Sequence, residues 1–417
     1  MLIKVSPQFA DTQLGSQGAK IIKKCVHRGF CNAHCPTFLA TGDTNMSPRG
    51  RIYLIKEYLQ GKSLTQVEMA SIKTCVGCRS CETDCPGGVK VARLIELAKV
   101  TIEHEYPQSS TLKQRLMKTL CKVLPSPQTP LLMMSSIARD GLNSKGSLYV
   151  AKNQVKARIS RHNPVSPNRT LALVTECTKA GLARNAHHSA QYILENMGYR
   201  VIELPKTHCC GAFKASIGES SKARQQAREN IDAWWGLLSE ESLEIVTISS
   251  SCEAQLKQYG NMLRCDKRYA DKANYIARKT INIAELINKD RLNIVHNSRA
   301  QYRVAMHIPC SLRHRSDKHR ELIQLVSRLP VIIDDTERER VCCGSGGTYS
   351  LFYPELASRI GKTKISDLTL GKPDYIVTAN TGCQYHMGKH TNIPVIHWLE
   401  LVFILMQSDK GIKKAAG

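Results

Sequence analysis

Cys75-Val-Gly-Cys78-Arg-Ser-Cys81-Glu-Thr-Asp-Cys85-Pro86 has the most specific spacing in this sequence. Its frame, Cys-x2-Cys-x2-Cys-x3-Cys-Pro, is that of a bacterial cysteine run whose thiolates ligate [4Fe–4S] clusters, the fourth cysteine binding a second cluster. Zinc sites also use clustered cysteines, but they prefer two ligand pairs separated by a longer spacer. The stretch therefore predicts a domain that holds iron–sulfur clusters.

A second run with the same frame lies upstream, with arginine where the second cysteine is expected: Cys25-Val-His-Arg28-Gly-Phe-Cys31-Asn-Ala-His-Cys35-Pro36. If each fourth cysteine ligates the other cluster, one [4Fe–4S] site is complete and the other has three thiolates. A guanidinium is cationic at any working pH and is a poor metal ligand. The complete site consists of Cys35, Cys75, Cys78 and Cys81, and the incomplete one of Cys25, Cys31 and Cys85.

The incomplete site has three possible states. It could hold a [3Fe–4S] cluster, hold a [4Fe–4S] cluster with a labile or non-cysteine-ligated corner, or stay empty, and we favour the two filled forms. His27 and His34 are close enough in sequence to supply a ligand, although a lone histidine beside such a run is more often a bystander. The positive charge of Arg28 should favour the reduced state of this cluster.

The chain beyond residue 169 contains an internal repeat centred on two Cys-Cys-Gly sequences. In each copy a strand-like run leads to a lone cysteine, and 31 residues separate this cysteine from the Cys-Cys-Gly. A helix and a second strand-like run with its own cysteine follow. Short β-branched runs that alternate with amphipathic helices predict βαβ units and parallel sheets. Because ligands bind beyond the carboxyl ends of such strands, we expect Cys177, Cys252, Cys310 and Cys383 to lie there.

Each copy of the repeat supplies four candidate metal ligands. Adjacent cysteines can point into one site only where the backbone turns sharply, which Gly211 and Gly344 permit. Four thiolates suffice for tetrahedral zinc or for one iron–sulfur cluster, and the group bound stays open. Ordinary buried cysteines beside a structural glycine are the alternative. The sets are Cys177, Cys209, Cys210 and Cys252, and Cys310, Cys342, Cys343 and Cys383; Cys121 and Cys265 match neither and are interpreted as small hydrophobes.

The predicted fold is α+β and multidomain, with an N-terminal α-helical ferredoxin-like domain followed by two α/β Cys-Cys-Gly repeats. We expect the ferredoxin-like domain with both cluster motifs at residues 1–105, a basic helical linker region at 106–168, and the repeats at 169–265 and 300–403. Within the linker, leucines recur every fourth residue over residues 112–124, with lysines and arginine between them. Such a helix can lie on an anionic membrane, but we favour one packed into the core with a solvated charged face.

Composition limits the partners and the compartment. The net charge of +24 requires an acidic partner, which could be nucleic acid, anionic lipid or an acidic subunit. Aromatic residues are only 6% and do not interleave with the basic runs, so we expect no nucleic acid. We find no apolar run long enough to span a membrane and no secretory signal. The 17 cysteines should therefore bind metal in the cytoplasm rather than form disulfides.

Motifs around these cysteines resemble the iron–sulfur subunit of glycolate oxidase over about residues 20 to 402. Beside the two cysteine runs they are Ser47-Pro-Arg-Gly-Arg51, His208-Cys-Cys-Gly-Ala212, Asn230-Ile-Asp-Ala-Trp-Trp235, Pro309-Cys-Ser-Leu-Arg-His314, Cys342-Cys-Gly-Ser-Gly-Gly-Thr-Tyr349, Ala379-Asn-Thr-Gly-Cys383 and His397-Trp-Leu-Glu400. The resemblance implies an electron carrier that receives electrons from flavin-binding dehydrogenase subunits of the same complex and passes them to membrane quinone. It also implies a peripheral position on the inner face of the cytoplasmic membrane.

On this basis the chain itself is not the catalyst, and glycolate or a related 2-hydroxy acid is oxidised by its partners. The glycine-rich stretch at residues 344–347 does not fit a dinucleotide-binding motif. Alternatives are a heterodisulfide or thiol-disulfide reductase-like subunit, the iron–sulfur subunit of a lactate or glycerol-3-phosphate dehydrogenase, or a degenerate structural subunit. In heterodisulfide reductase subunits each repeat usually ends in Cys-x2-Cys, whereas Ser249 and Asn380 stand at those first positions here. Arg28 is the second departure, because the resembling subunit has cysteine there and carries two [4Fe–4S] clusters.

Overall fold

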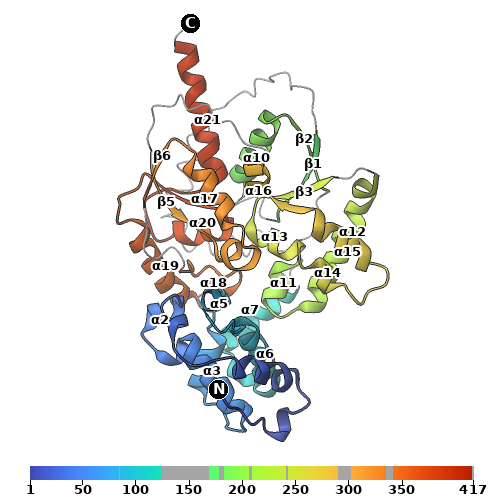
Figure 1. Ribbon diagram of the computed structural model, residues 1–417, viewed down its shortest axis with the longest axis vertical. Coiled ribbons are helices and arrows are strands. Elements are labelled where there is room, and N and C mark those ends of the chain that lie inside the picture. The colour runs from blue at the N-terminus through green and yellow to red at the C-terminus, as the bar shows by residue number, and fades with distance from the viewer. Residues whose placement is uncertain are drawn as a thin grey trace. The chain divides into compact units, whose positions relative to one another are not determined.

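The computed structural model describes residues 1–83, 85–123, 169–177, 183–205, 209–240, 243–289, 302–334 and 341–415 (Figure 1). The chain forms two compact units. The helical unit comprises Met1–Cys121 and Arg340–Lys364, and the sheet unit comprises Lys122–Glu339 and Ile365–Gly417. The predicted fold class is confirmed, since an N-terminal helical region precedes two α/β repeats. The predicted domain boundaries stay a prediction.

Short helices dominate the helical unit. They are α1 (Ala19–Lys23), α2 (Pro36–Thr41), α3 (Pro48–Leu59), α4 (Gln66–Lys73), α5 (Ser80–Thr83), α6 (Val91–Glu105), α7 (Leu112–Val123), α18 (Tyr349–Phe352) and the first part of α19 (Pro354–Leu368). Three of them begin with side-chain caps. Ser47 accepts a hydrogen bond from Gly50 N–H at the start of α3, and capping boxes are formed by Thr65 and Glu68 on α4 and by Thr111 and Gln114 on α7. Their apolar faces enclose one core that includes Ile55 and Leu94.

The sheet unit contains two four-stranded parallel sheets with the same strand order. The first runs β2-β1-β3-β4 and the second β6-β5-β7-β8. Their strands are β1 (Arg169–Leu173), β2 (Tyr199–Glu203), β3 (Glu244–Thr247), β4 (Thr280–Asn282), β5 (Tyr302–His307), β6 (Val331–Asp334), β7 (Tyr375–Thr378) and β8 (Val395–His397). The internal repeat is therefore a repeat of topology, and each copy ends in a short edge strand that the sequence analysis did not anticipate.

Helices cover these sheets, and one hydrophobic core joins the two repeats. The helices are α10 (Arg184–Asn196), α11 (Ala212–Ser216), α12 (Ser220–Glu240), α13 (Ser250–Leu256), α14 (Tyr259–Met262), α15 (Ala270–Lys279), α16 (Ile283–Lys289), α17 (His319–Ser327), α20 (Thr381–Gly388) and α21 (Trp398–Ala415). Along β1, Leu171 and Leu173 belong to the shared core and Ala172 to a second core on the other face. Burial on both faces is typical of parallel sheets.

The leucines of α7 do not pack as expected. Leu112, Leu116 and Leu120 are 82%, 70% and 44% exposed, so the expectation that this stripe faces a core is wrong. The inner face is formed instead by Gln114, which donates to Phe352 O at 3.2 Å, and by the buried Cys121. Of the two isolated cysteines, Cys121 therefore packs as a small hydrophobe, whereas Cys265 is exposed and does not. Leu124 lies outside the described residues.

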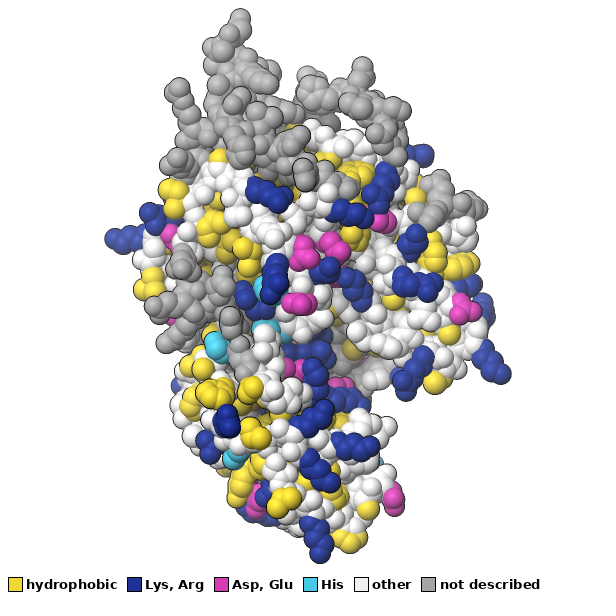
Figure 2. Space-filling model, viewed as in Figure 1, with side chains coloured by type: hydrophobic (Ala, Val, Ile, Leu, Met, Phe, Trp, Pro, Cys, Tyr) yellow, Lys and Arg dark blue, Asp and Glu magenta, His cyan; other side chains and the backbone are white. Residues whose placement is uncertain are grey.

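No helix among the described residues is both long and apolar enough to cross a bilayer. Lysine and arginine side chains are spread over the face seen in Figure 2, and carboxylates are much scarcer there. The excess of positive charge is therefore not gathered into one patch on that face.

Candidate functional site

The helical unit brings four of the predicted ligands around one cavity, which we call cavity 1. Its lining includes Cys35, Cys75, Cys78 and Cys81. Cys35 precedes α2, Cys75 and Cys78 lie on the loop after α4, and Cys81 lies in α5. This is the set that the crossed ligation rule predicts, and its role as a ligand set stays a prediction.

The thiols of cavity 1 surround one another closely enough to affect their ionisation. Burial raises the pKa of Cys81, and the neighbouring thiols of Cys78, Cys75 and Cys35 raise it further. Thiolates that repel one another in a buried site need positive charge between them, and an iron–sulfur cluster supplies it. The residues therefore fit a [4Fe–4S] cluster, which when bound accepts and releases single electrons.

Besides the exposed Arg79 in its lining, two further cations support cavity 1, and neither was predicted from the sequence. Arg51 on α3 is 1% exposed, and its Nε donates to Ser71 O at 2.7 Å. Its Nη1 donates to Thr37 Oγ1 at 3.0 Å and lies 3.9 Å from the Sγ of Cys35. Lys99 on α6 donates to Cys75 O at 2.7 Å. N–H donors and positive charge beside a cluster favour its reduced form. The Ser-Pro-Arg-Gly-Arg stretch pointed to Arg51 only through its resemblance to the family.

The three remaining N-terminal cysteines line a separate cavity in the same unit, cavity 2. Cys25, Cys31 and Cys85 face it, together with His27 and Arg28. Burial raises the pKa of Cys31 to about 11, and the thiol of Cys25 is the largest charge contribution to this shift. His34 does not line the cavity, which leaves His27 as the nearer of the two histidines considered.

The loops of the two cavities are wound alike. In the first run His27 and Gly29 have φ of 61° and 85°, and in the second Gly77 and Arg79 have φ of 73° and 65°. The two residues with a left-handed backbone thus occupy the same two positions of each run. Arg28 lies between them in the first loop, at the position that Cys78 has in the second. A non-glycine residue at such a φ costs roughly 1 kcal/mol. The first loop keeps the winding of a cluster-binding loop although one cysteine is absent, which favours the filled forms of this site.

The first Cys-Cys-Gly repeat gathers its four cysteines within the sheet unit. Cys177 follows β1, Cys209 and Cys210 precede α11, and Cys252 lies in α13, beyond the end of β3. Neighbouring thiols are hydrogen-bonded in the order Cys177, Cys209, Cys210, Cys252. The bonds that Cys209 accepts from the thiols of Cys177 and Cys210 lower its pKa, and donating to Cys209 raises the pKa of Cys177 and Cys210. Four thiols in such contact can hold zinc or an iron–sulfur cluster.

Backbone geometry and two buried side chains hold this Cys-Cys-Gly turn. Gly211 has a φ of 93°, and a Cβ there would lie 3.1 Å from Ala223 O, so the position requires glycine. Asn230 on α12 donates to Cys209 O at 3.2 Å, and the hydroxyl of Tyr259 donates to Cys210 O at 3.1 Å. Asn230 also donates to Tyr259 at 3.0 Å. The asparagine of the Asn-Ile-Asp-Ala-Trp stretch thus has a structural role that its sequence alone did not indicate.

The second set of cysteines is divided between the units. Cys342 and Cys343 belong to the helical unit, where Gly344 N–H donates to the Sγ of Cys342 at 3.5 Å. Cys310 and Cys383 belong to the sheet unit, beyond the ends of β5 and β7. Whether these four cysteines bind one group stays a prediction.

The two positions that lack cysteine are occupied by hydrogen-bonded polar side chains. Asn380 donates to Ser249 Oγ at 3.3 Å and to Ser251 Oγ at 3.2 Å, and it caps α20 by accepting from Cys383 N–H at 3.1 Å. The equivalent residues of the two repeats therefore bond to each other within the sheet unit. They join the repeats and are not available as soft metal ligands.

Comparison with known proteins agrees with this arrangement. The family described as "4Fe-4S dicluster domain" matches residues 21–89, and the family described as "Cysteine-rich domain" matches residues 171–257 and 304–388. The chain is 34% identical to the glycolate oxidase iron-sulfur subunit of Escherichia coli, over 96% of this chain and 98% of that one. It is 26% identical to the probable glycolate oxidase iron-sulfur subunit of Bacillus subtilis, over 87% of each. Lactate utilization protein A of Geobacillus thermodenitrificans is 28% identical over 47% of this chain and 80% of its own length.

Proposed function

This chain belongs to the family of glycolate oxidase iron–sulfur subunits. We propose that it receives electrons from flavin-binding subunits, which oxidise glycolate, and passes these electrons to quinone at the membrane. The observation that carries the proposal is the pair of cysteine-lined cavities within one helical unit. Two such sites in one compact unit suit transfer of single electrons in two steps. The chain is thus an electron carrier, and we assign it no residue that acts on glycolate.

We propose that Cys35, Cys75, Cys78 and Cys81 ligate the first cluster, and Cys25, Cys31 and Cys85 the second. Arg51 and Lys99 supply positive charge beside the first. The exposed Arg28 supplies it at the edge of the second. The first Cys-Cys-Gly set, Cys177, Cys209, Cys210 and Cys252, is proposed as a metal site of its own. Cys310, Cys342, Cys343 and Cys383 are proposed as its counterpart in the second repeat.

The acceptor side of the proposal is supported by α7. Its exposed Leu112, Leu116 and Leu120 lie at intervals of one helical turn. Arg115 and Lys118 stand between them on the same helix. A helix with this pattern binds anionic lipid in the plane of the interface. We propose that α7 holds the chain against the inner face of the cytoplasmic membrane, where quinone is available.

The experiment that tests the donor side is substrate-driven reduction of the clusters. The complex is purified without oxygen, and visible bleaching and electron paramagnetic resonance are recorded after adding glycolate, lactate or glycerol-3-phosphate. Glycolate alone should reduce the clusters. Reduction by lactate alone would assign the chain to a lactate dehydrogenase. The similarity to lactate utilization protein A supports this alternative. If dithionite reduces the clusters and none of the three donors does, the proposed function is wrong.

The reductase alternative makes a different demand on the chain. A heterodisulfide or thiol-disulfide reductase would need its Cys-Cys-Gly cysteines for turnover with a disulfide substrate. The hydrogen bond that Asn380 donates to Ser249 argues against metal ligation at those two positions. Activity of the purified chain toward a disulfide, lost on Cys210→Ser, would favour this alternative over electron transfer.

A further inference from the structure

The two cavities of the helical unit differ in what covers them, and equivalent valines show the difference. Val26 follows Cys25 in the first run, as Val76 follows Cys75 in the second. Val26 is 65% exposed, whereas Val76 packs against a small hydrophobic cluster that contains Tyr349. The same position of the same motif is thus open in one run and covered in the other.

The cover over cavity 1 comes from the chain itself. Residues 341–364 return to the helical unit, and Tyr349, Ala357 and Ile360 pack against Val76 and Ala40. The fit is close, because a Cβ on Gly346 would lie 3.0 Å from Val76 Cγ1. Arg359 fastens this segment by donating to Ala40 O at 2.7 Å. On this side the first cluster would be insulated by the protein.

Cavity 2 instead opens beside an apolar surface, which we call the cavity 2 face. Val26 and Phe30 line the cavity and are 65% and 59% exposed. Tyr53 on α3 is 45% exposed, and its ring stacks on His27 with centroids 6.3 Å apart. His27 is also part of the cavity lining, so it links the ring of Tyr53 to the cavity that Val26 and Phe30 line.

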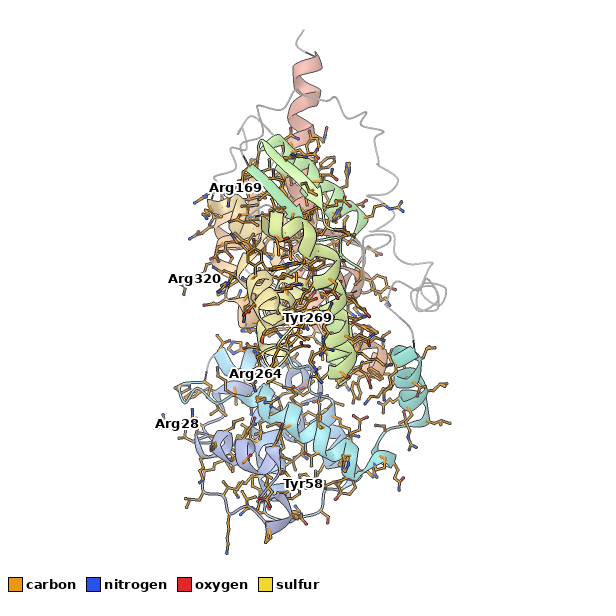
Figure 3. The ribbon with its side chains drawn as sticks, turned by 90° about the vertical axis from the view of Figure 1, so that its right-hand side faces the viewer. Arg28, Tyr58, Arg169, Arg264, Tyr269 and Arg320 are labelled. Atoms are coloured by element: carbon orange, nitrogen blue, oxygen red, sulfur yellow. The ribbon has the colours of Figure 1, made fainter. Side chains whose placement is uncertain are left out.

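Cations surround the cavity 2 face. Lys24, Arg28 and Arg49 are exposed and line the cavity. Figure 3 labels Arg28 at the periphery of the helical unit. The guanidinium of Arg49 lies close to the first cysteine loop, since a Cβ on Gly29 would lie 3.5 Å from its Nη1. Carboxylates are absent from the lining of cavity 2 in the described structure. Such a face complements an acidic surface that has an apolar centre.

We infer that the cavity 2 face is the docking site of the electron-donating, flavin-binding subunit, which presents an acidic surface with an apolar centre. An apolar centre with a polar, charged rim is the usual anatomy of a protein–protein interface. Aromatic residues and arginine, here Phe30, Tyr53 and Arg49, are the types enriched at protein interfaces. Docking there places the donor beside the second cluster and gives Arg28 a role in recognition as well as beside the cluster. The inference rests on the proposed function.

The test uses the complex purified from cells with an affinity tag on this chain. Two double variants disrupt the face: Phe30→Asp with Arg28→Glu on the loop, and Tyr53→Asp with Arg49→Glu on α3, outside both cysteine runs. Val67→Asp with Val100→Asp is the matched control, because these valines are 68% and 63% exposed and line neither cavity. Flavin per chain, iron per chain and glycolate-driven cluster reduction are measured at low and high salt.

Both face variants should lose bound flavin and slow cluster reduction about tenfold or more, and the α3 variant, which changes no residue of the cysteine runs, should do so with iron content unchanged, while the control keeps flavin and normal reduction. Higher salt should release flavin from the wild type, because the attraction between the exposed charges is screened. If the wild type brings no flavin, the proposed function fails. If the wild type brings flavin and the α3 variant retains it with normal reduction, the docking inference fails. Loss of binding to anionic phosphatidylglycerol vesicles with flavin retained would assign the face to lipid and also overturn it.

Discussion

Replacing Arg51 with methionine should lower the reduction potential of the first cluster. Arg51 is 1% exposed, and its guanidinium reaches the Sγ of Cys35 across 3.9 Å. The added electron makes the cluster more negative, so a nearby cation stabilises the reduced form more than the oxidised form. Methionine keeps much of the volume and removes the charge and the donors.

The size of the shift follows from Coulomb's law. Two unit charges at the 3.9 Å that separate Arg51 Nη1 from Cys35 Sγ interact by about 4 kcal/mol at an effective dielectric constant of about 20. The added electron spreads over the whole cluster, so about a quarter of it resides near Cys35, which leaves about 1 kcal/mol. Since about 59 mV corresponds to a tenfold change for a one-electron couple, the potential should fall by about 45 mV.

The assay is a redox titration followed by electron paramagnetic resonance on anaerobically purified protein. Arg51→Lys restores the charge without the planar fork and should recover part of the shift. Arg93→Met is the matched control, because Arg93 lies on α6, is 42% exposed and pairs with Glu96 at 3.3 Å. An unchanged midpoint in Arg51→Met, with full iron content, would refute the electrostatic reasoning. A loss of iron would instead show that the hydrogen bonds to Ser71 and Thr37 hold the site together.

Three further predictions follow from particular contacts. Arg28→Cys should bring iron to about eight atoms per chain, from about seven if the second site holds a [3Fe–4S] cluster, and abolish any [3Fe–4S] resonance, because the loop is already wound for a ligand there; a [3Fe–4S] resonance that persists would show that position 28 does not reach the cluster. Gly211→Ala should destabilise the protein by about 1–3 kcal/mol in thermal unfolding, since a Cβ would meet Ala223 O at 3.1 Å with φ at 93°, and a wild-type melting temperature would contradict this. Leu116→Glu on α7 should abolish salt-sensitive binding to anionic vesicles, whereas Val67→Glu should not; equal binding by both variants would remove α7 as the membrane contact.

The cysteines and the strands were predictable because their signals are local. The spacing of the cysteines alone assigned Cys35 and Cys85 to different sites, and they line cavity 1 and cavity 2 respectively. Cys177 and Cys252 follow strands that strand-like runs in the sequence had predicted. The edge strands β4 and β8 are three residues long, and runs so short carry too little periodicity to be recognised.

The environment of the clusters was not predictable, because it depends on which face of a helix meets a neighbour. Arg49 and Arg51 stand two residues apart in one motif, yet one is exposed at cavity 2 and the other is buried at cavity 1. Two residues correspond to about 200° around a helix, which places them on opposite sides of α3. The prediction that the leucines of α7 are buried was wrong for the same reason. The sequence pattern showed an apolar stripe on the helix but not which side of the helix faces the core. No sequence feature indicated that residues 341–364 return to the helical unit.

For the proposed relay between two clusters, the unequal cover of the two cavities implies a direction. An electron enters most readily where a cluster is near the surface, and Val26 shows that the loop of cavity 2 is open. At the equivalent position of cavity 1, Val76 packs against the segment around Tyr349, so on that side the first cluster would be less open to the donor. Arg51 and Lys99 would hold that inner cluster at a potential high enough to draw the electron inward. Arg28 is then consistent with function, because it lies at cavity 2, where the electron enters and a cation recognises the donor. The second cluster needs only to accept an electron and pass it to the first cluster.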